Sequence, residues 1–298
     1  MITAFWNINT GPSSFDHRLQ TLARWVDEVK PALLMLCEVG HGLLVKPASG
    51  QRKIEAALGG YELAGFVDTR DKSGGTTSLC LAALALKGSG FKATSVSADN
   101  INLKQARNLL KVEIQPQDGA KSYPVWGLHA DPTLEGGRRA CEAIAAQLGT
   151  AAGAGAVFGG DFNATAALAE KSGLTVSRPR GYYEPGAGDG KPVPPADGIK
   201  LGMPAGPPMR ATHWKVRAGT TPGATRRDKT ARGNEVLRNH RSMGVALVPA
   251  DLIDYAVARP ANDGGARTIT PLANCLSHDT WDDILAQFDH APVVYHIA

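Results

Sequence analysis

The stretch VFGGDFNAT, residues 157–165, decides how the rest of the chain is interpreted. It runs from apolar residues of strand type into two glycines, an aspartate and an asparagine. Gly, Asp and Asn are common turn formers, so the ordinary interpretation is a tight turn after a buried strand. The alternative is a site for a hard cation, in which the carboxylate of Asp161 and the amide oxygen of Asn163 are ligands.

The bulk composition is that of an ordinary soluble globular protein. Hydrophobic residues make up 43% and charged residues 20% of the 298 residues, and no apolar run approaches the ~20 residues of a membrane helix. No signal peptide is recognised in this sequence, so we expect a cytoplasmic protein of bacterial type. The four cysteines lack metal-ligand spacing, and we expect them to be reduced and mostly buried.

The modest net charge of +4 hides a strongly basic segment. Nine Lys and Arg residues lie between Arg210 and Arg241, against two acidic residues. This segment therefore carries +7, and the remainder of the chain carries −3. The residues before it are rich in Gly and Pro, which is typical of loops. We expect one domain over residues 1–298, with a Gly/Pro-rich and basic insertion at about 178–242.

Hydrophobic periodicity predicts more strands than helices. Strands are expected over residues 1–9, 31–39, 61–67, 76–86, 91–98, 108–115, 122–131, 156–161, 243–259 and 288–298. Helices are expected over residues 13–30, 50–58, 135–149 and 164–173. This pattern predicts an α/β (α+β) sandwich of four layers, in which two mixed, mainly antiparallel sheets are flanked by helices.

Polar side chains recur near the ends of the expected strands. They are Asn7, Asn9, Glu38, His129, Asp161, Asn163, Asp254 and the pair Asp289 and His290. Ionisable groups inside apolar strands are costly unless they are paired or bound to a metal. Each of these residues has a structural explanation when taken singly, as a turn cap or one half of an ion pair. Their coincidence at one end of the strands favours a shared site.

These residues resemble the endonuclease/exonuclease/phosphatase superfamily, whose members have the DNase I-like fold. The motifs FWNIN, LLMLCEV, GLHAD, GGDFNAT, LIDYAV and FDHAPVV occur in the order of that family. The resemblance covers the chain except for roughly residues 170–245, and the ordered set GDFN, IDY and DHAPV is specific. The IDYAVA segment and the strand with His129 are most similar to the nuclease branch, which includes DNase I and the cytolethal distending toxin subunit.

The resemblance implies a metal site and a proton-transfer group. Glu38, with Asn7 or Asn9 beside it and with Asp289, would hold Mg²⁺ or Mn²⁺ through oxygen atoms. His290 would act as general base or acid, because imidazole titrates near neutral pH.

Further roles follow from the same resemblance. Asp254 would orient the His290 ring, while Asp161 and Asn163 would position the attacking water and the phosphate. His129 would contact the phosphate or protonate the leaving oxygen. The residues expected to bind phosphate or nucleic acid are Arg107, His213, Lys215, Arg226 and Arg227.

Two positions depart from the family pattern. The serine that precedes Asp-His in the family is Phe288 here, so the hydrogen bond of that serine is lost. No carboxylate partner for His129 is evident from the sequence, and Glu62 is a candidate by position only.

The family also contains phosphatases of inositol phosphates, sphingomyelinases and deadenylases, so the fold does not fix the substrate. The basic segment favours a nucleic-acid backbone as its partner. Trp214 is almost its only aromatic residue, so base stacking is expected to make a minor contribution to binding. We therefore expect a metal-dependent phosphodiester hydrolase, with DNA endonuclease activity favoured and no membrane or obligate protein partner. The alternatives are a phosphatase or phosphodiesterase of small or lipid phosphoesters, and an inactive nucleic-acid-binding member.

Overall fold

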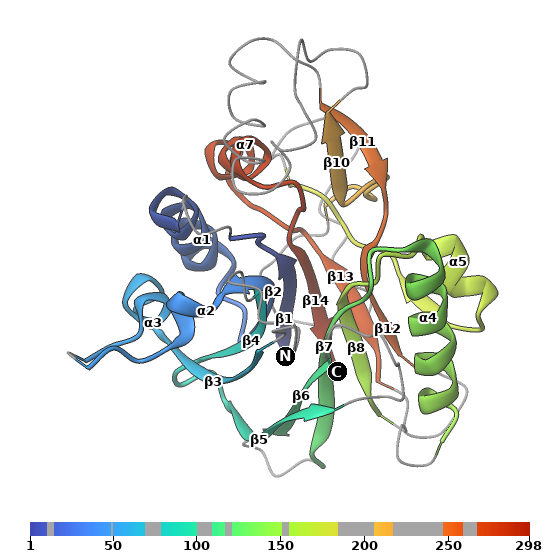
Figure 1. The fold of residues 1–298 in the computed structure, drawn as a ribbon, viewed down its shortest axis with the longest axis horizontal. Coiled ribbons are helices and arrows are strands. Elements are labelled where there is room, and N and C mark those ends of the chain that lie inside the picture. Colours follow the sequence, from blue (N-terminus) through green and yellow to red (C-terminus); the bar gives the residue numbers. More distant parts are fainter. Residues whose placement is uncertain are drawn as a thin grey trace.

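Two six-stranded sheets lie face to face in the computed structural model of the chain (Figure 1). The structure describes residues 1–10, 15–48, 50–68, 79–99, 109–116, 121–150, 155–183, 206–216, 247–258 and 267–298. Between the sheets, Phe5 and Met35 of the first pack with Val112 and Val125 of the second in a common apolar cluster.

The first sheet has the strand order β13-β14-β1-β2-β4-β3. Its strands are β1 (Ile2–Asn7), β2 (Leu33–Gly40), β3 (Tyr61–Asp68), β4 (Leu79–Leu86), β13 (Ile269–Leu272) and β14 (Val293–Ile297). Only the neighbours β1 and β2 are parallel, and the other described pairs are antiparallel.

The second sheet has the strand order β5-β6-β7-β8-β12-β9. Its strands are β5 (Phe91–Asp99), β6 (Leu109–Pro116), β7 (Tyr123–His129), β8 (Val157–Asp161), β9 (Thr175–Ser177) and β12 (Asp254–Ala258). Here β7 and β8 are the parallel pair. A separate ribbon is formed by β10 (His213–Val216) and β11 (Leu247–Asp251), and it projects from the end of the sandwich beside the last helix (Figure 1).

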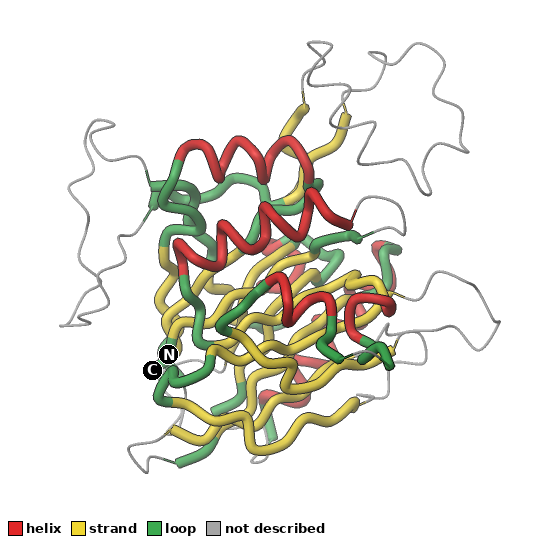
Figure 2. The backbone as a smooth tube through the Cα atoms, turned by 90° about the vertical axis from the view of Figure 1, so that its left-hand side faces the viewer, coloured by secondary structure: helices red, strands yellow, loops and turns green. Residues whose placement is uncertain are grey.

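Helices cover the outer faces of both sheets. The helices are α1 (Phe15–Val29), α2 (His41–Leu44), α3 (Lys53–Ala57), α4 (Leu134–Leu148), α5 (Ala166–Lys171) and α7 (His278–Gln287). Apolar residues of α1 and α7 pack on the first sheet, and those of α4 and α5 pack on the second. Figure 2, seen from the side of the first sheet, shows helices in front of the strands. None of the described helices is long and apolar enough to cross a membrane.

These four layers confirm the predicted fold class, but the C-terminal third differs from the expected elements. Residues 243–259, expected as one strand, contain β11 and β12, which belong to different sheets because the chain turns at Leu252 and Ile253. The last strand begins at Val293 instead of residue 288. Helix α7 and strand β13 were not predicted; α7 has few apolar residues, and its first turn is capped by Ser277, whose hydroxyl accepts from the Thr280 N–H.

Part of the predicted insertion is built into the fold. Residues 206–216 are described, and within them Ala211 and Thr212 are buried. The chain there forms a β-bridge between His213 and His290. The remainder of the insertion, residues 184–205 and 217–242, lies outside the described residues.

The two glycines of the opening stretch allow close approach, Gly159 between the two sheets and Gly160 between adjacent strands of the second sheet. A Cβ atom at Gly159 would lie 2.4 Å from the Phe5 ring of the facing sheet. A Cβ atom at Gly160 would lie 2.2 Å from the carbonyl oxygen of Leu128 on β7, and Gly160 has a φ of +131°. Side chains at these two positions would therefore force apart the strands that carry the polar residues.

We predict that Gly160→Ala lowers the free energy of unfolding by about 3 kcal/mol or more, because it combines a backbone clash with an unfavourable φ. The matched control is Gly173→Ala, where φ is +88° but no atom lies within 4 Å of the new Cβ. Strain alone should cost the control about 1 kcal/mol. Urea denaturation measures both, and equal losses in the two variants would contradict this account.

Candidate active site

Three of the polar residues occupy neighbouring register positions on adjacent strands. His129 of β7 pairs with Asp161 of β8, and Asp161 pairs with Asp254 of β12. All three are buried, with exposed fractions of 4%, 2% and 1% respectively. Because buried ionisable groups need partners, the hydrogen bonds of these three residues indicate how the site is organised.

Asp161 is the centre of these contacts. Its Oδ2 accepts a hydrogen bond of 3.0 Å from Nδ2 of Asn7, which lies on the first sheet. Its Oδ1 accepts one of 2.9 Å from the backbone N–H of Asn163. Asn163 has a φ of 47° and donates its amide to the carbonyl oxygen of Ala130. The opening stretch is thus both a tight turn and a polar site.

His290 forms a buried pair with Asp254. Its Nδ1 lies 2.9 Å from Oδ2 of Asp254, while its Nε2 lies 3.9 Å from Oδ2 of Asp161. The second distance is too long for a hydrogen bond, so Asp161 acts on the ring through its charge. The backbone N–H of Asp254 donates to Oγ1 of Thr212, and the carbonyl oxygen of His290 accepts from the Trp6 indole. Both partners are therefore held from several sides.

The surrounding carboxylates control the protonation of this pair. Burial by itself lowers the pKa of His290, but the charges of Asp254, Asp161 and Asp289 outweigh burial and raise that pKa well above 6.5. Burial raises the pKa of the Asp254 carboxyl to about 6, against the opposing attraction of His290. In the metal-free protein, the pair is consequently an imidazolium and a carboxylate at neutral pH.

The partner of His129 is Glu38. Nε2 of His129 lies 3.2 Å from Oε1 of Glu38, whereas Glu62, the candidate by position, is exposed on β3. Glu38 has a φ of 53° and sits where the register between β2 and β4 shifts, between Leu36 and Val39. Such an irregularity redirects a side chain, which is why counting along the strand did not reveal this contact.

Asn9 and Asp289 form the other side of the site. Nδ2 of Asn9 donates to Oδ2 of Asp289 over 3.3 Å. Oδ1 of Asp289 is buried and has no hydrogen-bond partner among the described residues. A buried carboxylate oxygen without a donor suits a cation ligand. Asn9, Glu38 and Asn163 are three of the four described non-glycine residues with positive φ, and strained backbone of this kind clusters at functional sites.

Arg18 is a residue of the site that was not predicted from the sequence. This residue of α1 is 2% exposed and donates to the backbone carbonyl oxygens of Ile8 and Asn9. Burial lowers its pKa to about 10, although Asp289 and Glu38 oppose this shift. Its guanidinium lies 5.3 Å from the centre of the Phe288 ring. Phe288 in turn packs against Trp6, so the position that is serine in the family supports the site through apolar packing.

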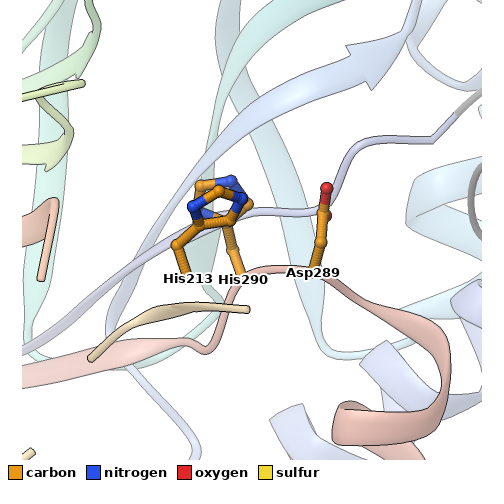
Figure 3. Close-up of side chains that lie close together, drawn as sticks. All are labelled: His213, Asp289 and His290. Carbon is orange, nitrogen blue, oxygen red and sulfur yellow. The ribbon is translucent and has the colours of Figure 1, made fainter. Parts of the chain in front are cut away.

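His213 lies against His290 (Figure 3). Their rings stack with centroids 4.6 Å apart and planes inclined by 24°. Together with Asp289 they could hold a metal by proximity alone. However, imidazole lone pairs lie in the ring planes, and nearly parallel planes do not meet about 2 Å from each nitrogen, as a shared metal requires. We therefore interpret the two rings as a stack and not as a pair of metal ligands.

The other predicted binding residues are not placed by the structure. Arg107, Arg226 and Arg227 lie outside the described residues, as does the side chain of Lys215 on β10. Their contacts with phosphate or nucleic acid stay predictions.

The chain matches the model of a known protein family. A family model described as the Endonuclease/Exonuclease/phosphatase family matches residues 4–262. A comparison with the sequences of curated proteins returns no significant match.

Solved structures with the same fold cover the whole chain. A family protein from Bacteroides vulgatus has 13% identity and a TM-score of 0.60, covering 100% of this chain and 98% of that one. D. rerio TDP2, complexed with a single-stranded DNA product, has 12% identity and a TM-score of 0.58, covering 100% and 98%. The mannosyl-6-phosphatase Bt3783 of Bacteroides thetaiotaomicron has 12% identity and a TM-score of 0.54, covering 100% and 99%. At these identities the likeness shows the fold alone, and it confirms the DNase I-like sandwich.

We predict that Asp254→Asn lowers the pKa of His290 in the metal-free protein. Burial lowers this pKa, and in the variant fewer carboxylate charges remain to raise it. The imidazole should lose its proton at a lower pH than in the wild type, as followed by NMR of the ring. Asp282→Asn is the control, since Asp282 lies 3.6 Å from His278 on the exposed surface of α7. An unchanged His290 pKa in the Asp254 variant would refute the pairing.

Proposed function

We propose that this chain, which belongs to the endonuclease/exonuclease/phosphatase family, is a divalent-metal-dependent phosphodiester hydrolase that acts on nucleic acid. Family members are hydrolases of phosphoester bonds. The observation that carries the proposal is the buried pair of His290 and Asp254, whose imidazole Nε2 faces Asp161. We expect DNA endonuclease activity, in keeping with the nuclease-like motifs.

His290 is the proposed proton-transfer group. Because Asp254 holds Nδ1, Nε2 is the nitrogen free to exchange protons with a reacting group. In hydrolysis the water oxygen forms a bond to phosphorus, the water proton passes to the unprotonated Nε2 of the neutral form of His290, and the bond to the leaving oxygen breaks. His129, held by Glu38, is the candidate donor of a proton to that leaving oxygen. Asp161 and Asn163 would position the water and the phosphate between the two imidazoles.

The proposed cation ligands are Glu38 and Asp289, with amide oxygens of Asn7 and Asn9 nearby. Their fit rests on the buried Oδ1 of Asp289, which has no hydrogen-bond partner in the part of the chain that the structure describes, and on a donor set made of oxygen atoms. Such a set suits Mg²⁺ or Mn²⁺. When bound, the cation supplies positive charge that offsets the carboxylates around His290 and stabilises charge on the phosphate.

Two structures of the same fold illustrate the choice of substrate. D. rerio TDP2 was captured with a single-stranded DNA product, and the Bacteroides protein is a mannosyl-6-phosphatase. The fold therefore admits both nucleic acid and small phosphomonoesters. The basic composition of residues 210–241 supports nucleic acid, because Lys and Arg bind a phosphate backbone.

Nicking of supercoiled plasmid tests the proposal. We expect nicking with Mg²⁺ or Mn²⁺, none in EDTA, and a loss of about 10²- to 10⁴-fold in His290→Ala, because proton transfer contributes that much to the rate. The control is His41→Ala, which removes an imidazole at the first residue of α2, outside the candidate active site. A folded His290→Ala protein with full activity would overturn the site. Absence of nicking, with phosphate released from small monoesters, would replace the nuclease by a phosphatase.

A further inference from the structure

Three half-buried aromatic side chains meet beside the candidate active site. Tyr182 follows β9, Trp214 lies in β10 and Trp281 lies in α7, so the three come from distant parts of the chain. The rings of Trp214 and Trp281 are 6.2 Å apart and nearly perpendicular. The rings of Trp281 and Tyr182 are 6.5 Å apart and nearly parallel. We call these three residues the aromatic cluster.

The aromatic cluster is tied directly to the catalytic groups. The backbone N–H of Trp214 donates to the carbonyl oxygen of Asp289 over 2.9 Å. The preceding residue, His213, stacks on His290. The ribbon of β10 and β11 lies beside α7 in Figure 1. The aromatic cluster therefore lies next to the Asp289–His290 segment of the candidate site.

The exposure of these rings points to a ligand. Trp6 and Trp25, in the core, are fully buried, whereas Trp214 and Trp281 are only partly buried. Leaving apolar ring surface in water is unfavourable. A flat ring that stacks on this surface would remove it from water.

The charges around the aromatic cluster discriminate between parts of a nucleotide. Helix α7 carries Asp279, Asp282 and Asp283. Asp283 pairs with Arg24 of α1. Asp282, however, lies 3.6 Å from His278, whose ring centroid is 6.0 Å from that of Tyr182. The carboxylate of Asp282 would therefore repel a phosphate at this edge of the aromatic cluster. A nucleobase is neutral and planar, and it stacks on aromatic side chains without regard to its identity. The surface is thus suited to the base and unsuited to the backbone.

We infer that the aromatic cluster is a stacking subsite for an unpaired nucleobase next to the scissile phosphate. The inference rests on the proposed function and narrows it, because a base within continuous duplex cannot leave its neighbours without cost. Single-stranded or locally unpaired nucleic acid is then the preferred substrate class. This proposal differs from the sequence-based expectation that base stacking is minor, since two of the three rings lie outside the basic segment.

Binding and cleavage of matched oligonucleotides test the subsite. The probes are a labelled oligothymidylate and the same backbone with abasic tetrahydrofuran units in place of the nucleotides. Binding is measured by fluorescence anisotropy in EDTA, and cleavage is measured with Mg²⁺. We expect the wild type to bind the base-containing probe roughly 10-fold more tightly, in line with stacking of one base.

The variants are Trp214→Leu and Trp281→Leu, each beside its Phe counterpart. The Leu variants should lose the preference for bases, and the Phe variants should largely keep it, because a ring remains. The control is Val45→Ala, which removes an exposed apolar side chain elsewhere. A preference for bases that persists in folded Leu variants, or that is lost equally in the Phe variants, would overturn the subsite.

The outcomes separate the subsite from the proposed function. Base-dependent binding that requires Trp214 and Trp281, without cleavage of either probe, would support the subsite and contradict the hydrolase. Cleavage of both probes at equal rates and with equal affinity would support the hydrolase and contradict the subsite. Failure to bind or cleave either probe would overturn both.

Discussion

The site depends on one hydrogen bond between the two sheets, from Nδ2 of Asn7 to Oδ2 of Asp161. It joins the end of β1 to the end of β8 in a region from which water is excluded. An amide that donates to a buried carboxylate contributes about 1.5–3 kcal/mol, and an unpaired partner costs more. Only when the sheets are held in this way can His290, next to the first sheet, face Asp161 and Asp254 on the second.

Register and backbone strain convert this contact into a chemical site. Adjacent strands place His129, Asp161 and Asp254 in one line, so their side chains need no loop to bring them together. The residues that cannot follow regular strand geometry are Glu38 and Asn163, both with positive φ. Neighbouring contacts hold the backbone of each residue. Each residue therefore points its polar side chain in a direction that a regular strand would not allow.

The sequence predicted the strand-end residues well, because the end of a buried strand is visible as a change from apolar to polar residues. Asp161 was found in this way, whereas Asp254 was noticed inside one long expected strand and begins β12 in the structure. It did not predict the contact of Glu38 with His129, which depends on an irregular register. Arg18 was missed since a charged residue on a helix normally faces solvent. His213 was predicted to bind phosphate or nucleic acid, but its stacking on His290 was not predicted, because the composition around it is loop-like and tertiary packing alone brings the two rings together.

The central claim is that a cation and a proton-transfer group lie together where the two sheets join. The most direct test is the anomalous diffraction signal of Mn²⁺ in crystals of the protein. We expect a peak in contact with the carboxylate of Glu38 or Asp289, on the side of the site where Oδ1 of Asp289 has no hydrogen-bond partner among the described residues. A peak only at carboxylates outside the site, such as those of α7, would contradict it, as would the absence of any bound ion.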